Sequence, residues 1–187
     1  ITTTTTATLG FGVDANWHEE SDYYVPDLWT LVKNIKATRI RTGGVRRTLL
    51  DQAKANGVRI MMVLGSAMSA EQVRTSSPWY SSKEALKARI DRLNLAQYRN
   101  HEGLWGYDIA NEPYYNDTLA DILIYGLQYV KSIDPTHPVT IGLSNCASWV
   151  VDDQGIWIQK RRAWFEKFQP YVDVLDVHLY AYGKEDK

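Results

Sequence analysis

The sequence predicts an α/β fold in which helices pack on a parallel β-sheet. Short apolar runs alternate with segments of helical periodicity along the 187 residues, and the last such run is the sixth. The run at 58–64 (VRIMMVL) is almost entirely apolar, which is typical of a parallel strand buried on both faces. Polar residues follow the apolar runs at their carboxyl ends. Alternation of this kind requires right-handed crossovers between parallel strands.

Each predicted strand is a short apolar run bounded by polar residues, glycine or proline. The first run opens into the polar sequence DANWHEE at 14–20, and Gly43 with Gly44 ends the second. The predicted strands span residues 9–17, 37–42, 58–64, 105–110, 139–143 and 172–180.

Apolar residues at helical spacing mark the first two connections. In the segment 26–36, four apolar residues from Leu28 to Ile35 fall at i, i+3, i+4 and i+7, and Pro26 stands where a first helical turn tolerates it. Gly57 follows the segment 45–56 at the position where helices commonly end. These two segments are therefore predicted to be helices.

The remaining connections show their own start and stop signals. Ser82 is suited to cap a helix over 83–99, after a longer polar loop at 65–82. A helix over 118–133 is stopped by the pair Asp134-Pro135, and a last helix is predicted over 159–168.

Composition excludes several classes of protein. The 21 Lys and Arg residues nearly balance the 22 Asp and Glu residues, so the net charge of −1 gives no footprint for nucleic acid or an anionic membrane. No apolar run reaches the ~18 residues that a membrane span needs. The single cysteine, Cys146, excludes a disulfide framework. The chain holds 7 Trp and 12 Tyr but 3 Phe, a surplus that suits either a sugar-binding surface or a Trp-rich core.

The chain divides into a Thr-rich segment at 1–8 and a single domain at 9–187. The segment lacks the basic region and the apolar region of an intact signal peptide. It resembles a linker remnant or the start of a secreted mature chain, with an extension of the sheet as the alternative. We expect a secreted protein on this basis, and a cytoplasmic location is the alternative.

Two architectures fit the alternation: a doubly wound open sheet and a closed (β/α)8 barrel. The first strand–helix turn lacks G-x-G-x-x-G, which argues against a dinucleotide site, and P-loop, H-E-x-x-H and G-x-S-x-G patterns are absent too. In both architectures the carboxyl ends of the strands form the active-site edge. The polar residues at those ends are Asn16, Trp17, His18, Arg39, Arg41, Ser66, Asn111, Glu112, Ser144, Asn145, His178 and Tyr180.

The segment 106–113 (GYDIANEP) resembles the fourth strand of clan A, a large clan of retaining β-glycoside hydrolases. The resemblance implies that Glu112 is the acid/base and that Asn111 hydrogen-bonds the sugar 2-hydroxyl beside the cleaved bond. It also implies the fold class, a (β/α)8 TIM barrel of which this chain supplies about six β/α units. No metal and no organic cofactor is implied, and the expected partner is a carbohydrate of the β-glucan or β-mannan type.

Two further segments resemble the cellulase- and mannanase-type, family 5-like members. The segment 37–41 (ATRIR) resembles their second strand, whose arginine supports the nucleophile. Arg39 aligns best, and Arg41 has the same strand parity. His178-Leu-Tyr180 resembles the sixth-strand His-x-Tyr, whose side chains line the cleft. Trp17 and His18, after the first strand, are further candidates for substrate contact.

Each of these residues also has a purely structural interpretation. Glu112 could be a helix-start carboxylate favoured by the helix dipole. Arg39 and Arg41 could be ion-pair partners, and His178 could be an interior histidine. The two residues after the first strand could simply fill the barrel mouth.

The clan places its nucleophile, a second glutamate, at the end of a seventh strand, and no such strand follows Tyr180 in this sequence. A complete barrel takes about 250 residues. The 187 residues are therefore interpreted as part of a longer enzyme, with two alternatives: a fragment completed by a partner chain, and a carbohydrate-binding barrel without catalysis. An unrelated barrel enzyme acting on phosphorylated metabolites is a further rival.

Overall fold

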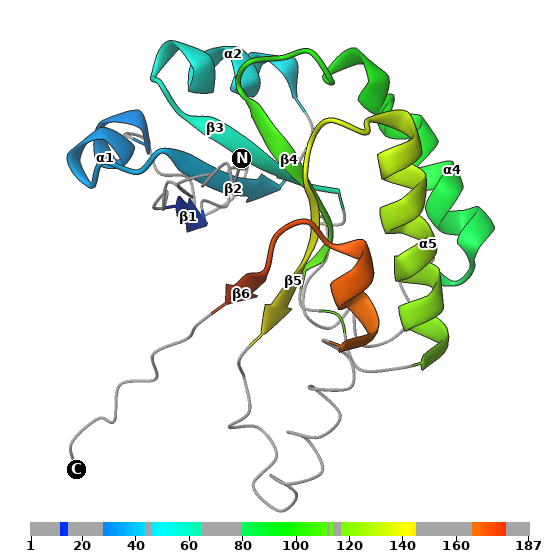
Figure 1. Ribbon diagram of the computed structural model, residues 1–187. Coiled ribbons are helices and arrows are strands. Elements are labelled where there is room, and N and C mark those ends of the chain that lie inside the picture. Colours follow the sequence, from blue (N-terminus) through cyan, green and yellow to red (C-terminus); the bar gives the residue numbers. More distant parts are fainter. Residues whose placement is uncertain are drawn as a thin grey trace, which may run out of the picture.

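In the part of the chain that the computed structural model describes, six strands form one parallel sheet with helices between them (Figure 1). Neighbouring strands pair in the order β1-β2-β3-β4-β5-β6, the same order as in the sequence. A doubly wound sheet reverses its order at a switch point, whereas a barrel adds each strand beside the previous one. The chain therefore forms part of a (β/α) barrel, as the sequence predicts. The residues that the structure describes are 12–14, 28–43, 46–64, 80–111, 113, 117–144 and 166–178.

The strands are short, and the helices lie between them in the sequence. The strands are β1 (Gly12–Asp14), β2 (Arg39–Gly43), β3 (Arg59–Val63), β4 (Leu104–Asn111), β5 (Val139–Ser144) and β6 (Asp176–His178). The α-helices are α1 (Leu28–Asn34), α2 (Arg47–Ala55), α4 (Lys83–Leu93) and α5 (Asp117–Ile133), and short 3₁₀ turns are η2 (Leu95–Gln97) and η4 (Gln169–Tyr171).

The helix predicted over 83–99 ends earlier than expected. Ser82 caps α4 as predicted, because its Oγ accepts a hydrogen bond from the backbone N–H of Ala85 at 3.1 Å. Asn94 then adopts a left-handed backbone with φ 48°, which terminates the helix, and η2 follows. Of the helix predicted over 159–168, only residues 166–168 are described, and they are helical. The predicted loop at 65–82 lies mostly outside the described residues.

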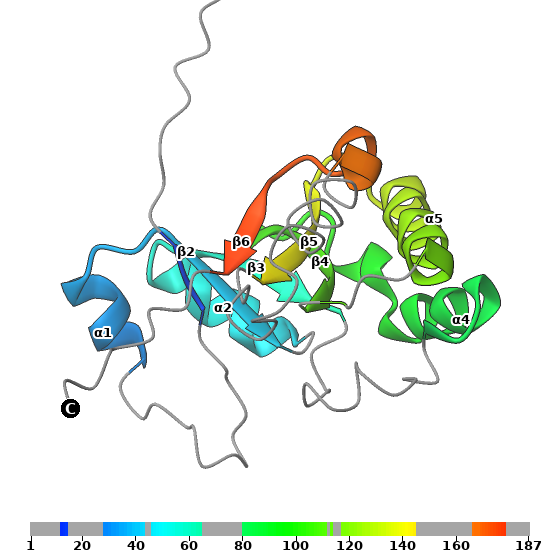
Figure 2. The same cartoon turned by 90° about the horizontal axis from the view of Figure 1, so that it is seen from below.

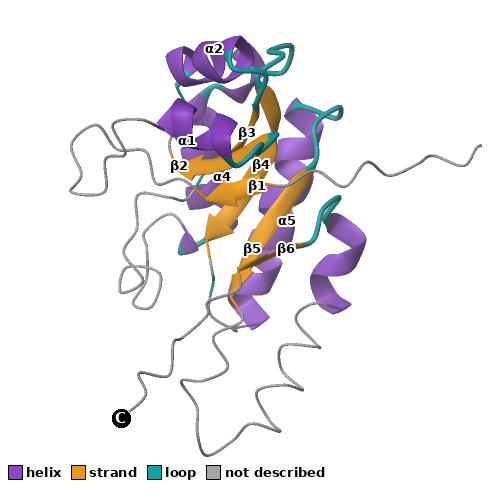
Figure 3. Cartoon of the chain, turned by 90° about the vertical axis from the view of Figure 1, so that its left-hand side faces the viewer, coloured by secondary structure: helices purple, strands orange, loops and turns teal. Residues whose placement is uncertain are grey.

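The helices pack against one face of the sheet, and this face forms the hydrophobic core. Alternate residues of the central strands, such as Ile60, Met62, Tyr107, Ile109 and Ile141, point toward α2, α4 and α5 and are buried. Figures 2 and 3 show these helices on the outer side of the curved sheet. None of the helices in the described ranges has both the length and the apolarity needed to cross a bilayer.

The close approach of β4 to α2 requires a residue without a side chain at position 103. A Cβ on Gly103 would lie 2.2 Å from the backbone oxygen of Leu50, which cannot move aside without distorting α2. A Cβ on Gly126 of α5 would instead meet the end of the Leu86 side chain at 2.6 Å, and that side chain can rotate.

We therefore expect Gly103→Ala to be the more damaging of two matched substitutions. It should lower the free energy of unfolding by about 2–3 kcal/mol, in the upper range for overpacking, while Gly126→Ala should cost about 1 kcal/mol. Urea unfolding of both variants measures this difference. Equal losses of stability in the two variants would mean that the backbone at Leu50 moves aside as easily as the side chain of Leu86.

The connection from α5 to β5 is organised by a buried carboxylate, Asp134. It accepts hydrogen bonds from the Tyr107 hydroxyl at 2.9 Å, from the hydroxyl of Thr136 at 2.7 Å and from the His137 ring at 2.8 Å when that nitrogen carries a proton. Burial opposes ionisation, but the hydrogen bonds from these groups lower the pKa of Asp134 below its usual value. The ionised form is thus the one that the fold stabilises.

Asp134→Asn should remove a pH-dependent part of the stability. Because the folded pKa lies below the unfolded value of about 3.9, the contribution is fully present above that pH and is lost as the pH falls through the folded pKa. We expect the variant to lose about 1–3 kcal/mol at pH 7 and to show a flatter stability profile below pH about 4. Unfolding curves from pH 3 to 7 check this, and an unchanged acid slope would contradict it.

Candidate active site

The inner face of the sheet, opposite the helices, carries a charged cluster near the carboxyl ends of the strands. Arg41 of β2 donates hydrogen bonds to Asp108 of β4, from Nε at 2.8 Å and from Nη2 at 2.5 Å, both to Oδ2. The same Nη2 donates to Oδ1 of Asn111 at 2.7 Å. One guanidinium thus joins the second strand to the end of the fourth.

Asp108 is fully buried and also shapes the backbone around it. Its Oδ1 accepts from the backbone N–H of Ala110 at 3.0 Å and from that of Gly142 at 3.2 Å. The register between β4 and β5 shifts between Asp108 and Asn111, so the carboxylate replaces the ladder acceptors that are lost at this irregularity. Bulges of this kind re-aim the side chains that follow, here Asn111.

A second carboxylate shares the guanidinium. Asp176 of β6 lies 3.2 Å from Nε of Arg41, so two acidic groups face one basic group. Burial raises the pKa of Asp108 to about 6, the positive charge of Arg41 opposes that rise, and the negative charge of Asp176 adds to it. With both carboxylates ionised, Arg41, Asp108 and Asp176 together carry a net charge of −1.

The structure brings together some of the sequence-predicted residues and separates others. Asn111 contacts Arg41, and His178 is the last residue of β6, where its backbone is in register with that of Ser144 in β5. Arg39, which aligned best with the family arginine, lies instead with its guanidinium 4.1 Å from the centre of the Trp105 ring. Arg41 is therefore the arginine that reaches Asn111. The other predicted site residues lie outside the described residues: Glu112, Trp17, His18 and Tyr180.

Two members of the cluster, Asp108 and Asp176, were not among the residues singled out from the sequence. Each of the two nevertheless has a feature in the sequence that could have identified it. Asp108 is a charged residue inside an apolar strand, and such a residue needs a buried partner. Asp176 is a charged residue within the last predicted strand, two residues before the candidate His178.

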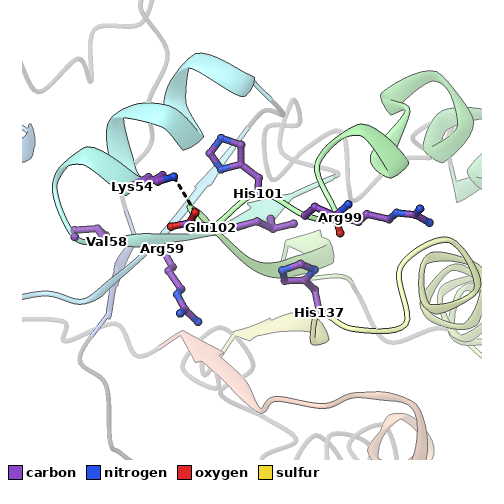
Figure 4. A pocket seen from close by; sticks show the side chains of 10 residues that line it. Lys54, Val58, Arg59, Arg99, His101, Glu102 and His137 are labelled. Carbon is purple, nitrogen blue, oxygen red and sulfur yellow. Dashed lines mark hydrogen bonds and ion pairs between the residues drawn. The ribbon is translucent and has the colours of Figure 1, made fainter.

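A pocket of about 450 Å³ lies at the opposite edge of the sheet, around the amino ends of β3 and β4 (Figure 4). Several of its ionisable side chains already have partners. Lys54 pairs with Glu102 at 2.9 Å, and His137 pairs with Asp134 at 2.8 Å. No described group of three or more His, Cys, Asp or Glu side chains is placed to hold a metal ion. The candidate site is therefore the charged cluster at the carboxyl edge, called the Arg41 cluster. Its described members are Arg41, Asp108, Asn111 and Asp176.

The sheet order and the position of this cluster define a barrel of the (β/α) class with its polar site at the carboxyl edge. Comparison with solved structures agrees with this class. A β-D-glucuronidase of Dictyoglomus thermophilum matches with a TM-score of 0.53 at 21% identity over 87% of this chain and 34% of that chain. A β-glucuronidase of Lactobacillus rhamnosus gives 0.51 at 21% identity, covering 72% and 24% of the two chains. A GH10 endoxylanase from a sugarcane soil metagenome gives 0.51 at 13% identity, covering 90% and 56%.

These similarities are to glycoside hydrolases that share the barrel, and at such identities they establish the fold. The chain spans between about a quarter and somewhat over half of the length of these three structures. No protein-family model and no curated protein matches the sequence. The family 5-like assignment within the clan stays a prediction, as does the domain boundary at residue 9.

Proposed function

We propose that this chain is part of a retaining β-glycoside hydrolase acting on a poly- or oligosaccharide of the β-glucan or β-mannan type. The observation that carries the proposal is the hydrogen bond from Arg41 to Asn111 at the carboxyl edge of the barrel, directly before Glu112 in the sequence. The fold similarity to glucuronidases and a xylanase supports the same class.

In this proposal Glu112 protonates the oxygen of the departing sugar and later activates water. The nucleophile is a glutamate on a seventh strand that the 187 residues do not include. A retaining enzyme holds its two carboxyl groups ~5–5.5 Å apart, and the second group forms a glycosyl-enzyme intermediate. When Asp108 and Asp176 are both ionised, their charges outweigh that of Arg41 and favour a protonated acid nearby, because like charges raise the pKa of a carboxyl group.

The remaining predicted residues take supporting parts. Asn111 donates to the sugar 2-hydroxyl, while His178 and Tyr180 line the cleft and Trp17 with His18 borders it. Arg39 lies at the amino end of β2, with its guanidinium over the Trp105 ring, and in this proposal it acts as a structural residue. We also propose that the protein is secreted, as polysaccharide substrates require.

The test uses the full-length protein that contains this chain. It is incubated with β-1,4-mannan, β-1,4-glucan and mixed-linkage β-glucan, and the reducing ends released are measured. Turnover of at least one substrate is expected. Binding of an oligosaccharide without release of reducing ends would instead support a carbohydrate-binding barrel, and neither binding nor release would overturn the proposal.

A further inference from the structure

The two oxygens of Asp108 have different partners. Oδ1 accepts from two backbone N–H groups, those of Ala110 and Gly142, and so holds the bulge in β4. Oδ2 accepts from Nε and Nη2 of Arg41. The carboxylate thus fixes both the backbone before Asn111 and the cation that contacts Asn111.

The contact with Arg41 determines how the Asn111 amide is turned. A guanidinium has donors only, so the group of Asn111 that faces it must be the amide oxygen, at 2.7 Å from Nη2. The NH₂ group of the amide is then directed away from Arg41. A ligand at this position therefore meets two N–H donors, which suit a hydroxyl or ring oxygen.

We propose that Asp108 is a positioning residue of the site: through Arg41 it orients the Asn111 amide so that the NH₂ group donates to the sugar 2-hydroxyl. The inference rests on the proposed function and adds to it a residue three positions before Asn111. Without the Oδ2 acceptor, Arg41 keeps Asp176 as a carboxylate partner at 3.2 Å, and we expect its guanidinium to move toward Asp176 and away from the Asn111 oxygen.

The variant Asp108→Asn distinguishes the contact of Asp108 with the backbone from its contact with Arg41. Asparagine retains an Oδ1 acceptor for the backbone N–H groups but places an NH₂ group against the donors of Arg41. In the full-length protein, kcat/KM is measured for a 4-nitrophenyl β-glycoside and for its 2-deoxy analogue. We expect about a tenfold or larger loss for the parent substrate and little change for the 2-deoxy substrate.

Asp134→Asn is the matched control, because it also removes a buried, hydrogen-bonded carboxylate but lies at the other edge of the sheet. It should lower the melting temperature without changing the ratio of the two kcat/KM values. Equal losses on both substrates in Asp108→Asn would show a structural role only and would overturn the inference. If Asp108→Asn does not fold, Arg41→Lys is used. It keeps the charge without the planar fork, and the same selective loss is expected.

A second readout does not need turnover. The side-chain amide signal of Asn111 in a nitrogen-15 NMR spectrum, assigned by its loss in Asn111→Ala, should shift or broaden in Asp108→Asn and stay in place in Asp134→Asn. An unmoved signal would overturn the positioning role. A shifted signal together with a wild-type protein inactive on every glycoside would uphold the positioning geometry and reject the proposed function.

Discussion

Glu112→Ala should lower kcat/KM on a polysaccharide by about 10²–10⁴-fold, the usual contribution of a general acid or base. Sugar leaving groups are poor and need the proton that Glu112 supplies, whereas an activated aryl leaving group departs without it. Azide should restore turnover of activated aryl glycosides in this variant, because a small anion occupies the vacated space and attacks the glycosyl-enzyme. The product should be a glycosyl azide of retained configuration.

Glu102→Ala is the control for this experiment. Glu102 is an exposed glutamate at the opposite edge of the sheet, where it pairs with Lys54 at 2.9 Å. Its loss should leave hydrolysis unchanged. Wild-type rates in Glu112→Ala, or azide rescue that inverts the configuration, would contradict the role given to Glu112.

Arg41→Leu should be the most destabilising single change in the site. It leaves the fully buried Asp108 without its cation, and removing one partner of a buried ion pair costs about 3–5 kcal/mol. Arg39→Leu, the matched control, loses the stacking on Trp105, the contact that the described residues show, and should cost about 1 kcal/mol. Chemical unfolding at pH 7.5 measures both values.

The loss in Arg41→Leu should shrink as the pH falls from 7.5 to 5. Burial already raises the pKa of Asp108 to about 6, and removing Arg41 takes away the charge that opposes this rise. Because the folded pKa lies above the unfolded value of about 3.9, ionisation is penalised at high pH and the penalty is relieved on acidification. The double variant Arg41→Leu/Asp108→Asn should recover most of the stability. Additive losses would contradict a buried pair.

The parallel sheet and its two faces follow from sequence patterns, whereas the choice of a barrel over a doubly wound sheet came from the resemblance of the segment 106–113 to a known clan. A strand buried on both faces needs a continuous apolar run, as in β3. A strand with one polar face needs alternating residues, as around Arg39 and Arg41, and both patterns can be recognised in the sequence. The early end of α4 leaves no such trace. Asn94 is one polar residue among several there, and its left-handed backbone comes from local geometry.

The choice between Arg39 and Arg41 could not be made from the sequence, because both have the same parity on β2. In the structure, Arg41 lies two residues nearer the carboxyl end of β2 than Arg39, and only from this position does the guanidinium contact Asn111. The contact between Asp108 and Arg41 could not be predicted from the sequence either. The two residues are 67 positions apart, and only the register of the strands brings them together.

The stereochemistry of the first product shows directly whether this chain belongs to a retaining β-glycoside hydrolase. The full-length protein is mixed with a soluble β-glycoside, and the anomer released is followed by proton NMR before mutarotation. We predict that the β-anomer appears first and converts slowly to the equilibrium mixture. The α-anomer appearing first, or no release of sugar above the blank, would contradict a retaining β-glycoside hydrolase.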